Sequence, residues 1–125
     1  MELPNTQSEE ALKLWKSEII RFKEYLEKKF EVTITEEDIR EAVKTNNEVR
    51  NSLKRLYEVM KHDPVPIQGQ DLFKVLYGST FKFDRKAIPA EVNALADKVE
   101  KEYAEGKMLE KMPRILVSGC PVGGA

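Results

Sequence analysis

The sequence predicts a mainly α-helical chain with one strand at its C-terminal end. Apolar residues recur at spacings of three and four over most of the chain, which is the period of an α-helix. Residues typical of helix starts and stops flank these stretches. The run Ile115-Leu116-Val117 does not alternate with polar residues and leads into a glycine-rich stretch, which is typical of a strand buried on both faces. A strand of this kind belongs to an α/β domain.

The first predicted helix covers about residues 9–30. Ser8 is suited to cap its N-terminus, and Glu9 and Glu10 place negative charge in the first turn, where the helix dipole favours it. The apolar positions that fall on one face are Leu12, Trp15, Ile19, Phe22, Leu26 and Phe30. This helix is therefore expected to bury one long face.

The second predicted helix covers about residues 36–61. Thr35 and Asp38 resemble a capping box in which Asp replaces the usual Glu. Glu36 and Glu37 fall in the first turn, where they are interpreted as partners of the dipole and not as a general acid and base. The residues of the second stripe are Ile39, Ala42, Asn46, Val49, Leu53, Leu56 and Met60.

The two long helices are expected to form a long antiparallel hairpin, because only about five residues connect them. Trp15, Phe22 and Phe30 are bulky enough to dominate its seam. Asn46 is the one polar residue of the second stripe, and two interpretations of it stay open. In the first, which we prefer, Asn46 is a buried amide that fixes the register of the helix pair. In the second, Asn46 contacts a ligand near a domain junction. Arg50, one turn later, is its expected neighbour.

The second helix is expected to end in HDPVPIQG at 62–69, because its two prolines cannot continue a helix. His62, in the last helical turn, suits a role in capping the dipole better than one in catalysis. A short helix is expected over about 70–79. Its apolar side consists of Leu72, Phe73, Leu76 and Tyr77.

Another helix is expected over about 89–105. Pro89 suits its first position, and Gly106 is a natural residue for its C-terminal end. Its buried face is marked by Val92, Leu95, Val99 and Tyr103.

Composition and charge exclude several classes of function. The 125 residues include 21 Lys and Arg against 22 Asp and Glu, and the net charge of −1 gives no electrostatic case for binding nucleic acid. No apolar stretch approaches the roughly 20 residues that span a bilayer, so no membrane partner is expected. The N-terminus lacks the features of a secretory signal, and a single cysteine cannot form an internal disulfide. These features fit a cytoplasmic protein.

Few residues of the chain are suited to chemistry. His62 and Cys120 are the only histidine and cysteine, and they lie too far apart in sequence to indicate a nucleophile and its base. No cysteines or histidines stand at metal-ligand spacing. The GCPVGG stretch does not match the phosphate-binding pattern G-x-G-x-x-G. No catalytic residue is therefore predicted, and the chain alone is expected to be inactive.

Three blocks of the sequence together resemble one family. They are LWKSEIIRFKEYLEKKFEVTITEEDIREAVKTNNEVR, KHDPVPIQGQDLF and PRILVSGCPVGGA, in that order along the chain. The chain resembles the 2-hydroxyglutaryl-CoA dehydratase D-component family, which includes 2-hydroxyacyl-CoA dehydratase subunits, benzoyl-CoA reductase subunits and double-cubane cluster proteins. Members of this family are longer and carry cysteine-bearing domains on both sides. The resemblance therefore implies an internal fragment of an anaerobic enzyme.

The resemblance also implies a division of the chain and a cofactor of the parent protein. Residues 1–112 correspond to a helical segment between cluster-binding domains, and 113–125 to the first strand and glycine-rich loop of a truncated Rossmann-like domain. Family members hold iron–sulfur clusters through cysteine thiolates. Cys120 is the expected cluster ligand in the parent only, and Cys-Pro followed by paired glycines resembles the double-cubane branch. The alternative is a small buried residue in a loop. No cofactor is expected in the fragment.

Two functions from different classes stay open. The first is an internal piece of an iron–sulfur 2-hydroxyacyl-CoA dehydratase-like or double-cubane cluster protein, with a structural and subunit-packing role. Its partners are the remaining domains of the parent and a second copy or a related subunit. The second is a self-standing helical module for protein–protein interaction. The Ile-Leu-Val run favours the first, because such a run invites aggregation when it is exposed.

Overall fold

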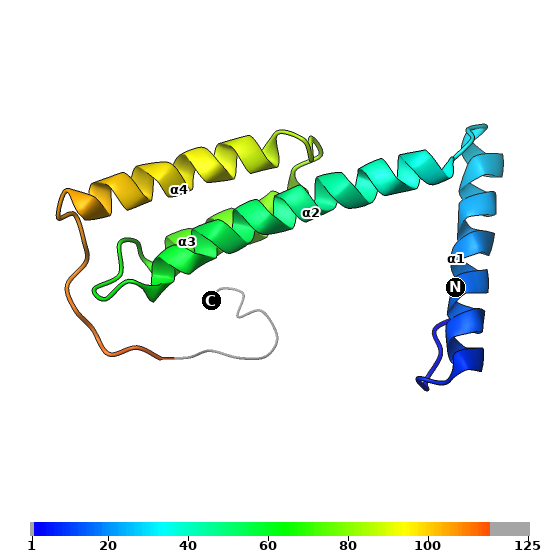
Figure 1. Ribbon diagram of the computed structural model, residues 1–125, viewed down its shortest axis with the longest axis horizontal. Helices are drawn as coiled ribbons and strands as arrows, with labels where there is room; N and C mark the ends of the chain where they lie inside the picture. The colour runs from blue at the N-terminus through cyan, green and yellow to red at the C-terminus, as the bar shows by residue number, and fades with distance from the viewer. Residues whose placement is uncertain (1, 116–125) are drawn as a thin grey trace. The chain divides into compact units, whose positions relative to one another are not determined.

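The structure is a computed structural model that describes residues 2–115 (Figure 1). Its α-helices in this range are α1 (Glu9–Phe30), α2 (Glu36–Glu58), α3 (Gly69–Gly78) and α4 (Ile88–Ala104). Short 3-10 turns follow α2 and α3, namely η1 (Val59–Lys61) and η2 (Ser79–Phe81). The mainly α-helical prediction is confirmed, with closely matching helix bounds. Among these helices, none has the length and apolarity needed to cross a membrane.

The C-terminal strand is the part of the predicted fold class that is not seen. Arg114 and Ile115, its first two residues, have no regular secondary structure, and residues 2–115 contain no strand. The physical reason is that a strand must pair its backbone groups with a neighbouring strand, and this range supplies only helices. The rest of the predicted strand and the loop with Cys120 fall in 116–125, outside the described residues.

The chain divides into two compact units, Met1–Lys44 and Thr45–Ala125, and the boundary falls within α2. The first unit contains α1, the connection after it and the beginning of α2. The second unit contains the remainder of α2 together with η1, α3, η2 and α4. The hydrophobic core of the described residues lies in this second unit.

Hydrogen bonds between side chains and backbone define the helix starts of the first unit. Oγ of Ser8 accepts a hydrogen bond from the N–H of Ala11 at 3.2 Å, so the predicted N-cap is confirmed. The N–H of Asp38 donates to Oγ1 of Thr35 at 3.1 Å, and the N–H of Thr35 donates to Oδ2 of Asp38 at 2.8 Å. This is the predicted capping box, formed with Asp in place of Glu.

The same backbone motif ends α1 and α4, but with different residues. After α1, Glu31 takes a φ of 53°, and the next N–H bonds back to the carbonyl of Glu27 at 3.1 Å. After α4, Gly106 takes a φ of 86°, and the next N–H bonds back to the carbonyl of Glu102 at 2.9 Å. Both are Schellman motifs. Gly106 adopts this conformation without strain, whereas a left-handed L-residue such as Glu31 costs roughly 1 kcal/mol.

The apolar face of α1 is not covered by other residues of the first unit. Trp15, Phe22 and Phe30 are 45%, 50% and 63% exposed, so no part of their own unit buries them, and the predicted seam against the remainder of α2 stays a prediction. Within α1 the buried residues are Ala11 and Glu18. The physical reason is that periodicity identifies the apolar face of a helix but not the surface that covers it.

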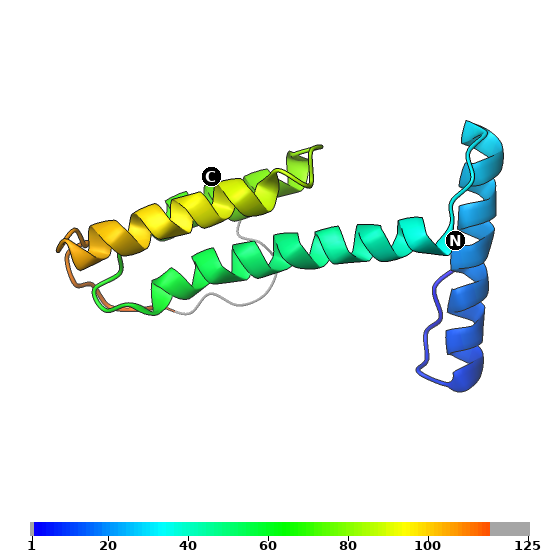
Figure 2. The same ribbon diagram turned by 45° about the horizontal axis from the view of Figure 1, so that its top comes forward.

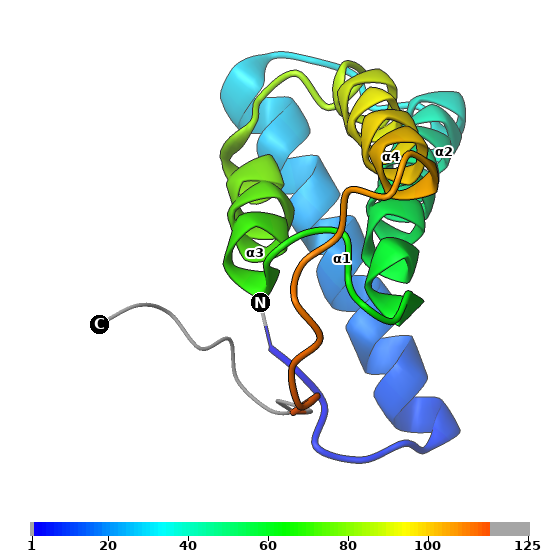
Figure 3. The same ribbon diagram turned by 90° about the vertical axis from the view of Figure 1, so that its left-hand side faces the viewer.

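In the second unit, α3 runs back along the C-terminal part of α2, and α4 turns again beside them (Figure 1, Figure 3). The buried side chains of its core are Val49, Leu56, Val59, Leu72, Ile88, Val92, Ala96 and Val99. Leu53, Met60 and Leu95 pack against this core. The predicted apolar stripes of α2 and α4 are thus confirmed in this unit, while Val59, Ile88 and Ala96 are core residues that the sequence analysis did not indicate.

Candidate functional site

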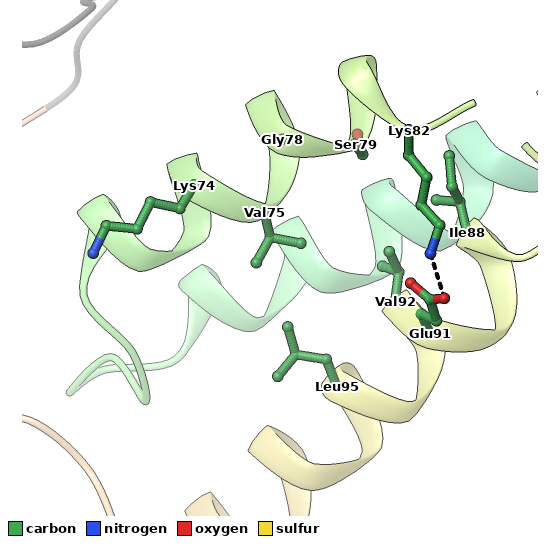
Figure 4. A pocket seen from close by; sticks show the side chains of 9 residues that line it. All are labelled: Lys74, Val75, Gly78, Ser79, Lys82, Ile88, Glu91, Val92 and Leu95. Atoms are coloured by element: carbon green, nitrogen blue, oxygen red, sulfur yellow. Dashed lines mark hydrogen bonds and ion pairs between the residues drawn. The ribbon is translucent and has the colours of Figure 1, made fainter. Parts of the chain in front are cut away.

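A pocket of about 290 Å³ lies in the second unit between the α3–η2 segment and the first part of α4 (Figure 4). Its apolar wall consists of Val75, Ile88, Val92 and Leu95. Its other lining residues are Lys74, Gly78, Ser79, Lys82 and Glu91. The side chains that form the apolar wall come from the same helix faces that build the core, so the pocket is an extension of the core towards solvent.

The polar groups of the pocket already have partners. Lys82 and Glu91 form an ion pair, drawn as a dashed line in Figure 4. Nζ of Lys74 donates to Oδ1 of Asp71 at 3.1 Å. Oγ of Ser79 donates to a backbone carbonyl one turn earlier at 2.7 Å, and no base among the described residues is hydrogen-bonded to it. The pocket therefore lacks an activated nucleophile and suits an apolar group better than a reaction.

Asn46 connects α2 to the loop that precedes α4. Its Oδ1 accepts a hydrogen bond from Nη2 of Arg85 at 3.4 Å, and Nη1 of Arg85 donates to the carbonyl of Ser79 at 3.1 Å. Arg50, the neighbour expected from the sequence, donates to Oδ1 of Asn47 at 2.6 Å. The contacts favour the structural interpretation of Asn46, with the loop residue Arg85 as one of its partners.

His62 lies at the end of η1, as predicted for a residue that closes the second helix. Its N–H donates to the carbonyl of Val59 at 3.3 Å. Its ring stacks on Tyr103 of α4, with the ring centroids 4.3 Å apart. This stacking ties the end of η1 to α4, and the sequence carried no signal for it because the two residues lie 41 positions apart (103 − 62).

Three carboxylates of the first unit have lowered pKa values: Asp38 of the capping box, and Glu18 and Glu27, which bind the backbone of more distant residues. The hydrogen bond from the N–H of Glu2 (2.8 Å), assisted by Arg21, holds the pKa of Glu18 below its ordinary value. The hydrogen bond from the N–H of Ile34 (2.7 Å) does the same for Glu27. A general acid needs a raised pKa near the working pH. Both groups therefore act as anions that hold nearby backbone in place.

Arg55 forms a bridge between helices that the sequence did not reveal. Its Nη2 lies 2.6 Å from Oδ1 of Asp97 and 2.8 Å from Oε2 of Glu100, both on α4. Hydrogen bonds to these two carboxylates, with Asp97 the larger influence, raise the pKa of Arg55. The spacing of three between Asp97 and Glu100 places them on one helix face, but only the packing of α4 beside α2 shows which cation they bind.

The described residues do not fit an iron–sulfur cluster. Such a cluster is held by several cysteine thiolates, and residues 2–115 contain no cysteine. Over the same residues, no group of three or more His, Cys, Asp or Glu side chains is placed to hold a metal ion. Cys120, the predicted ligand, lies outside the described residues, so its role stays a prediction.

Comparison with known proteins gives two findings. The model of the family described as 2-hydroxyglutaryl-CoA dehydratase, D-component, matches residues 1–125. A curated protein of Escherichia coli (strain K12), named "Putative dehydratase subunit YjiM", is 38% identical over 126 residues. The match covers 100% of this chain and 33% of that protein. The chain thus spans about one third of the length of this relative.

Proposed function

Because this chain belongs to the 2-hydroxyglutaryl-CoA dehydratase D-component family, we propose that it is an internal, structural part of a longer iron–sulfur dehydratase-like protein. Its role is to pack against other domains of the parent chain or against a neighbouring subunit. The reacting groups and the cluster belong to those other parts. The match to one third of a protein named as a dehydratase subunit supports this proposal.

The exposed apolar face of α1 is the observation that carries the proposal. We call its residues the α1 face: Leu12, Trp15, Ile19, Phe22 and Phe30. Their exposed fractions run from 45% to 63%. Monomeric proteins rarely expose contiguous apolar patches of this kind, and such patches mark surfaces that another protein segment covers. The rest of a longer parent chain supplies the cover.

The lack of reactive groups in the described residues supports a structural role over a catalytic one. The pocket beside α4 has paired charges and no activated nucleophile, and the carboxylates with shifted pKa values hold backbone segments. In the parent, Cys120 contributes at most one thiolate to a cluster, and the remaining ligands come from other segments. A parent of this type dehydrates a 2-hydroxyacyl-CoA ester or, in the double-cubane branch, reduces a small substrate.

A self-standing helical interaction module is the second candidate, because its partner protein would also cover the α1 face. The two candidates differ in where the cover comes from. In an internal segment the cover is part of the same polypeptide, whereas in a module it appears only when a second protein is added.

The experiment compares Trp15→Ala and Phe22→Ala in the 125-residue chain and in the full-length parent. If the parent buries the α1 face, each substitution lowers its free energy of unfolding by roughly 3 to 5 kcal/mol. In the isolated chain the loss is under about 1 kcal/mol, because these side chains are already half exposed. Glu24→Ala, on the polar side of α1, is the matched control. Equal, small losses of unfolding free energy in both proteins would refute the proposal. The helical interaction module would then be the favoured function.

The cofactor part of the proposal has its own test. Anaerobic reconstitution of the 125-residue chain with iron and sulfide should give no stoichiometric cluster absorbance, because one thiolate cannot hold a cluster. In the parent, Cys120→Ser should lower the iron content per chain while the helical circular dichroism stays unchanged. Full iron occupancy in that variant would reduce Cys120 to a packing residue.

A further inference from the structure

The segment that follows α4 is fastened to the loop that follows η1. We call residues 107–114 the C-terminal strap; in Figure 2 it is the orange segment that passes the green loop. The N–H of Leu109 donates to the carbonyl of Val65 at 3.0 Å. Nζ of Lys111 lies 3.0 Å from Oδ2 of Asp63. The strap therefore follows the loop over several residues, and all of these groups belong to the second unit.

Arg114 makes the last contact of the strap, at the C-terminal end of η1. Its Nη2 donates to the carbonyl of Met60, and its Nη1 lies 3.5 Å from the carbonyls of both Lys61 and His62. The last carbonyls of a helix have no donor within the helix. They also carry the negative end of the helix dipole, which favours a cation. One guanidinium thus donates to the carbonyl of Met60 and reaches the next two carbonyls at 3.5 Å, the outer limit of a hydrogen bond.

The three contacts of the strap differ in strength. The ion pair between Lys111 and Asp63 is exposed on both sides, with side chains 72% and 46% accessible, and such pairs contribute little. The Leu109 contact is one neutral backbone hydrogen bond. Arg114 combines a charged donor, several acceptors and the helix dipole, and its planar fork donates in more than one direction. It is therefore the contact on which the strap depends most.

We propose that Arg114 is a positioning residue that holds the C-terminal strap on the end of η1 and so determines where residue 115 lies against the helices of the second unit. By capping the end of η1 from a segment 52 to 54 positions later, it gives the following part of the polypeptide a defined starting point on the helices. If the chain is part of a longer protein, as proposed above, Arg114 helps to determine how the next domain is connected to the helices of this unit. The positioning itself is a property of the 125-residue chain and is tested there.

The test measures distances between spin labels at Glu48→Cys on α2 and Ile115→Cys after the strap, in a Cys120→Ser background. A strap held by Arg114 gives a narrow distance distribution. Arg114→Gln, which removes the charge and the fork, should broaden the distribution and raise amide exchange at Leu109 by about tenfold, as expected for loss of a charged hydrogen bond. Arg114→Lys, which keeps the charge, should restore part of both signals.

Two control variants complete the test. Arg40→Gln removes an exposed arginine whose partner, Glu36, lies on its own helix, and it should leave both signals unchanged. Lys111→Ala should have a smaller effect than Arg114→Gln. An unchanged distribution and unchanged Leu109 exchange in Arg114→Gln would overturn the proposal, as would a larger effect of Lys111→Ala. The proposed function is tested with substitutions in α1, whereas the role of Arg114 is tested with substitutions in the strap. Failure of one proposal therefore does not imply failure of the other.

Discussion

The first unit carries large apolar side chains along α1, yet it buries far less of this stripe than the second unit buries of its own. Trp15 and Phe22 of α1 are 45% and 50% exposed, whereas Val49 and Leu56 of α2 are 1% and 0% exposed. All four follow the same spacing of three and four. The difference teaches that a helical stripe becomes a core only where the chain returns to cover it, as α3 and α4 do in the second unit.

The two units are also stabilised by different interactions. The first depends on local hydrogen bonds: the Ser8 cap, the capping box at Thr35, and the anchors at Glu18 and Glu27. The second depends on buried apolar side chains from several helices, with Arg55 bridging to α4 at the surface. Local hydrogen bonds define helix ends but contribute about 1 kcal/mol each. The first unit is therefore the part whose order depends most on added cover.

The largest expected difference comes from matched truncations in the two units. Leu56→Ala should lower the free energy of unfolding of the second unit by about 2 to 5 kcal/mol, because Leu56 is fully buried. In the isolated chain, Trp15→Ala should cost under about 1 kcal/mol despite the larger side chain. Urea denaturation followed by circular dichroism measures both. Equal losses would mean that α1 is covered in solution and would break the comparison.

The capping box should affect only the first unit. Thr35→Ala removes the acceptor for the N–H of Asp38 and should destabilise the start of α2 by about 1 kcal/mol. Thr35→Ser keeps the oxygen and is the control. Amide exchange in the first turn of α2 should rise in the alanine variant alone, while exchange at Leu56 and Val92 stays unchanged. A rise at the core amides would show that the two units unfold together.

The two Schellman motifs provide a pair of opposite substitutions. Glu31→Gly should stabilise α1 by about 0.5 kcal/mol, because glycine relieves the left-handed strain but adds freedom to the unfolded chain. Gly106→Ala should destabilise α4 by about 1 kcal/mol, because alanine is strained in the left-handed conformation that Gly106 adopts. Thermal unfolding measures both changes. A Glu31→Gly variant that is less stable than the parent sequence would show that Glu31 makes a contact worth more than its strain.

Lowering the pH should destabilise the first unit before the second. This is the smallest of the expected effects. Hydrogen bonds hold the pKa values of Glu18, Glu27 and Asp38 below their ordinary values, and all three lie in the first unit. Folding thus favours their charged forms, so the stabilisation is present above about pH 4 and is lost as pH falls through the folded pKa values. Amide exchange measured stepwise from neutral to acid pH tests this order. Earlier loss of protection around Leu56 would contradict it.

Residue chemistry near the helix ends explains why much of the fold could be predicted. The Ser8 cap, the Thr35–Asp38 capping box and the Gly106 stop each depend on residues within a few positions of one another. The family was also predictable, because three ordered sequence blocks carried the resemblance that the family model confirms over residues 1–125. The predicted role of Cys120 stays a prediction, since that residue lies outside the described part of the chain.

Contacts between distant segments explain what could not be predicted. The guanidinium of Arg85 reaches Asn46 across 39 positions, Arg55 reaches Asp97 across 42, and Arg114 reaches Met60 across 54. The types and local spacings of the residues decided the helices, their ends and their apolar faces, because these depend on interactions within one or two turns. Tertiary structure alone decided which apolar face became core and which cation met which acceptor, because burial and long-range pairing depend on how the chain folds back on itself.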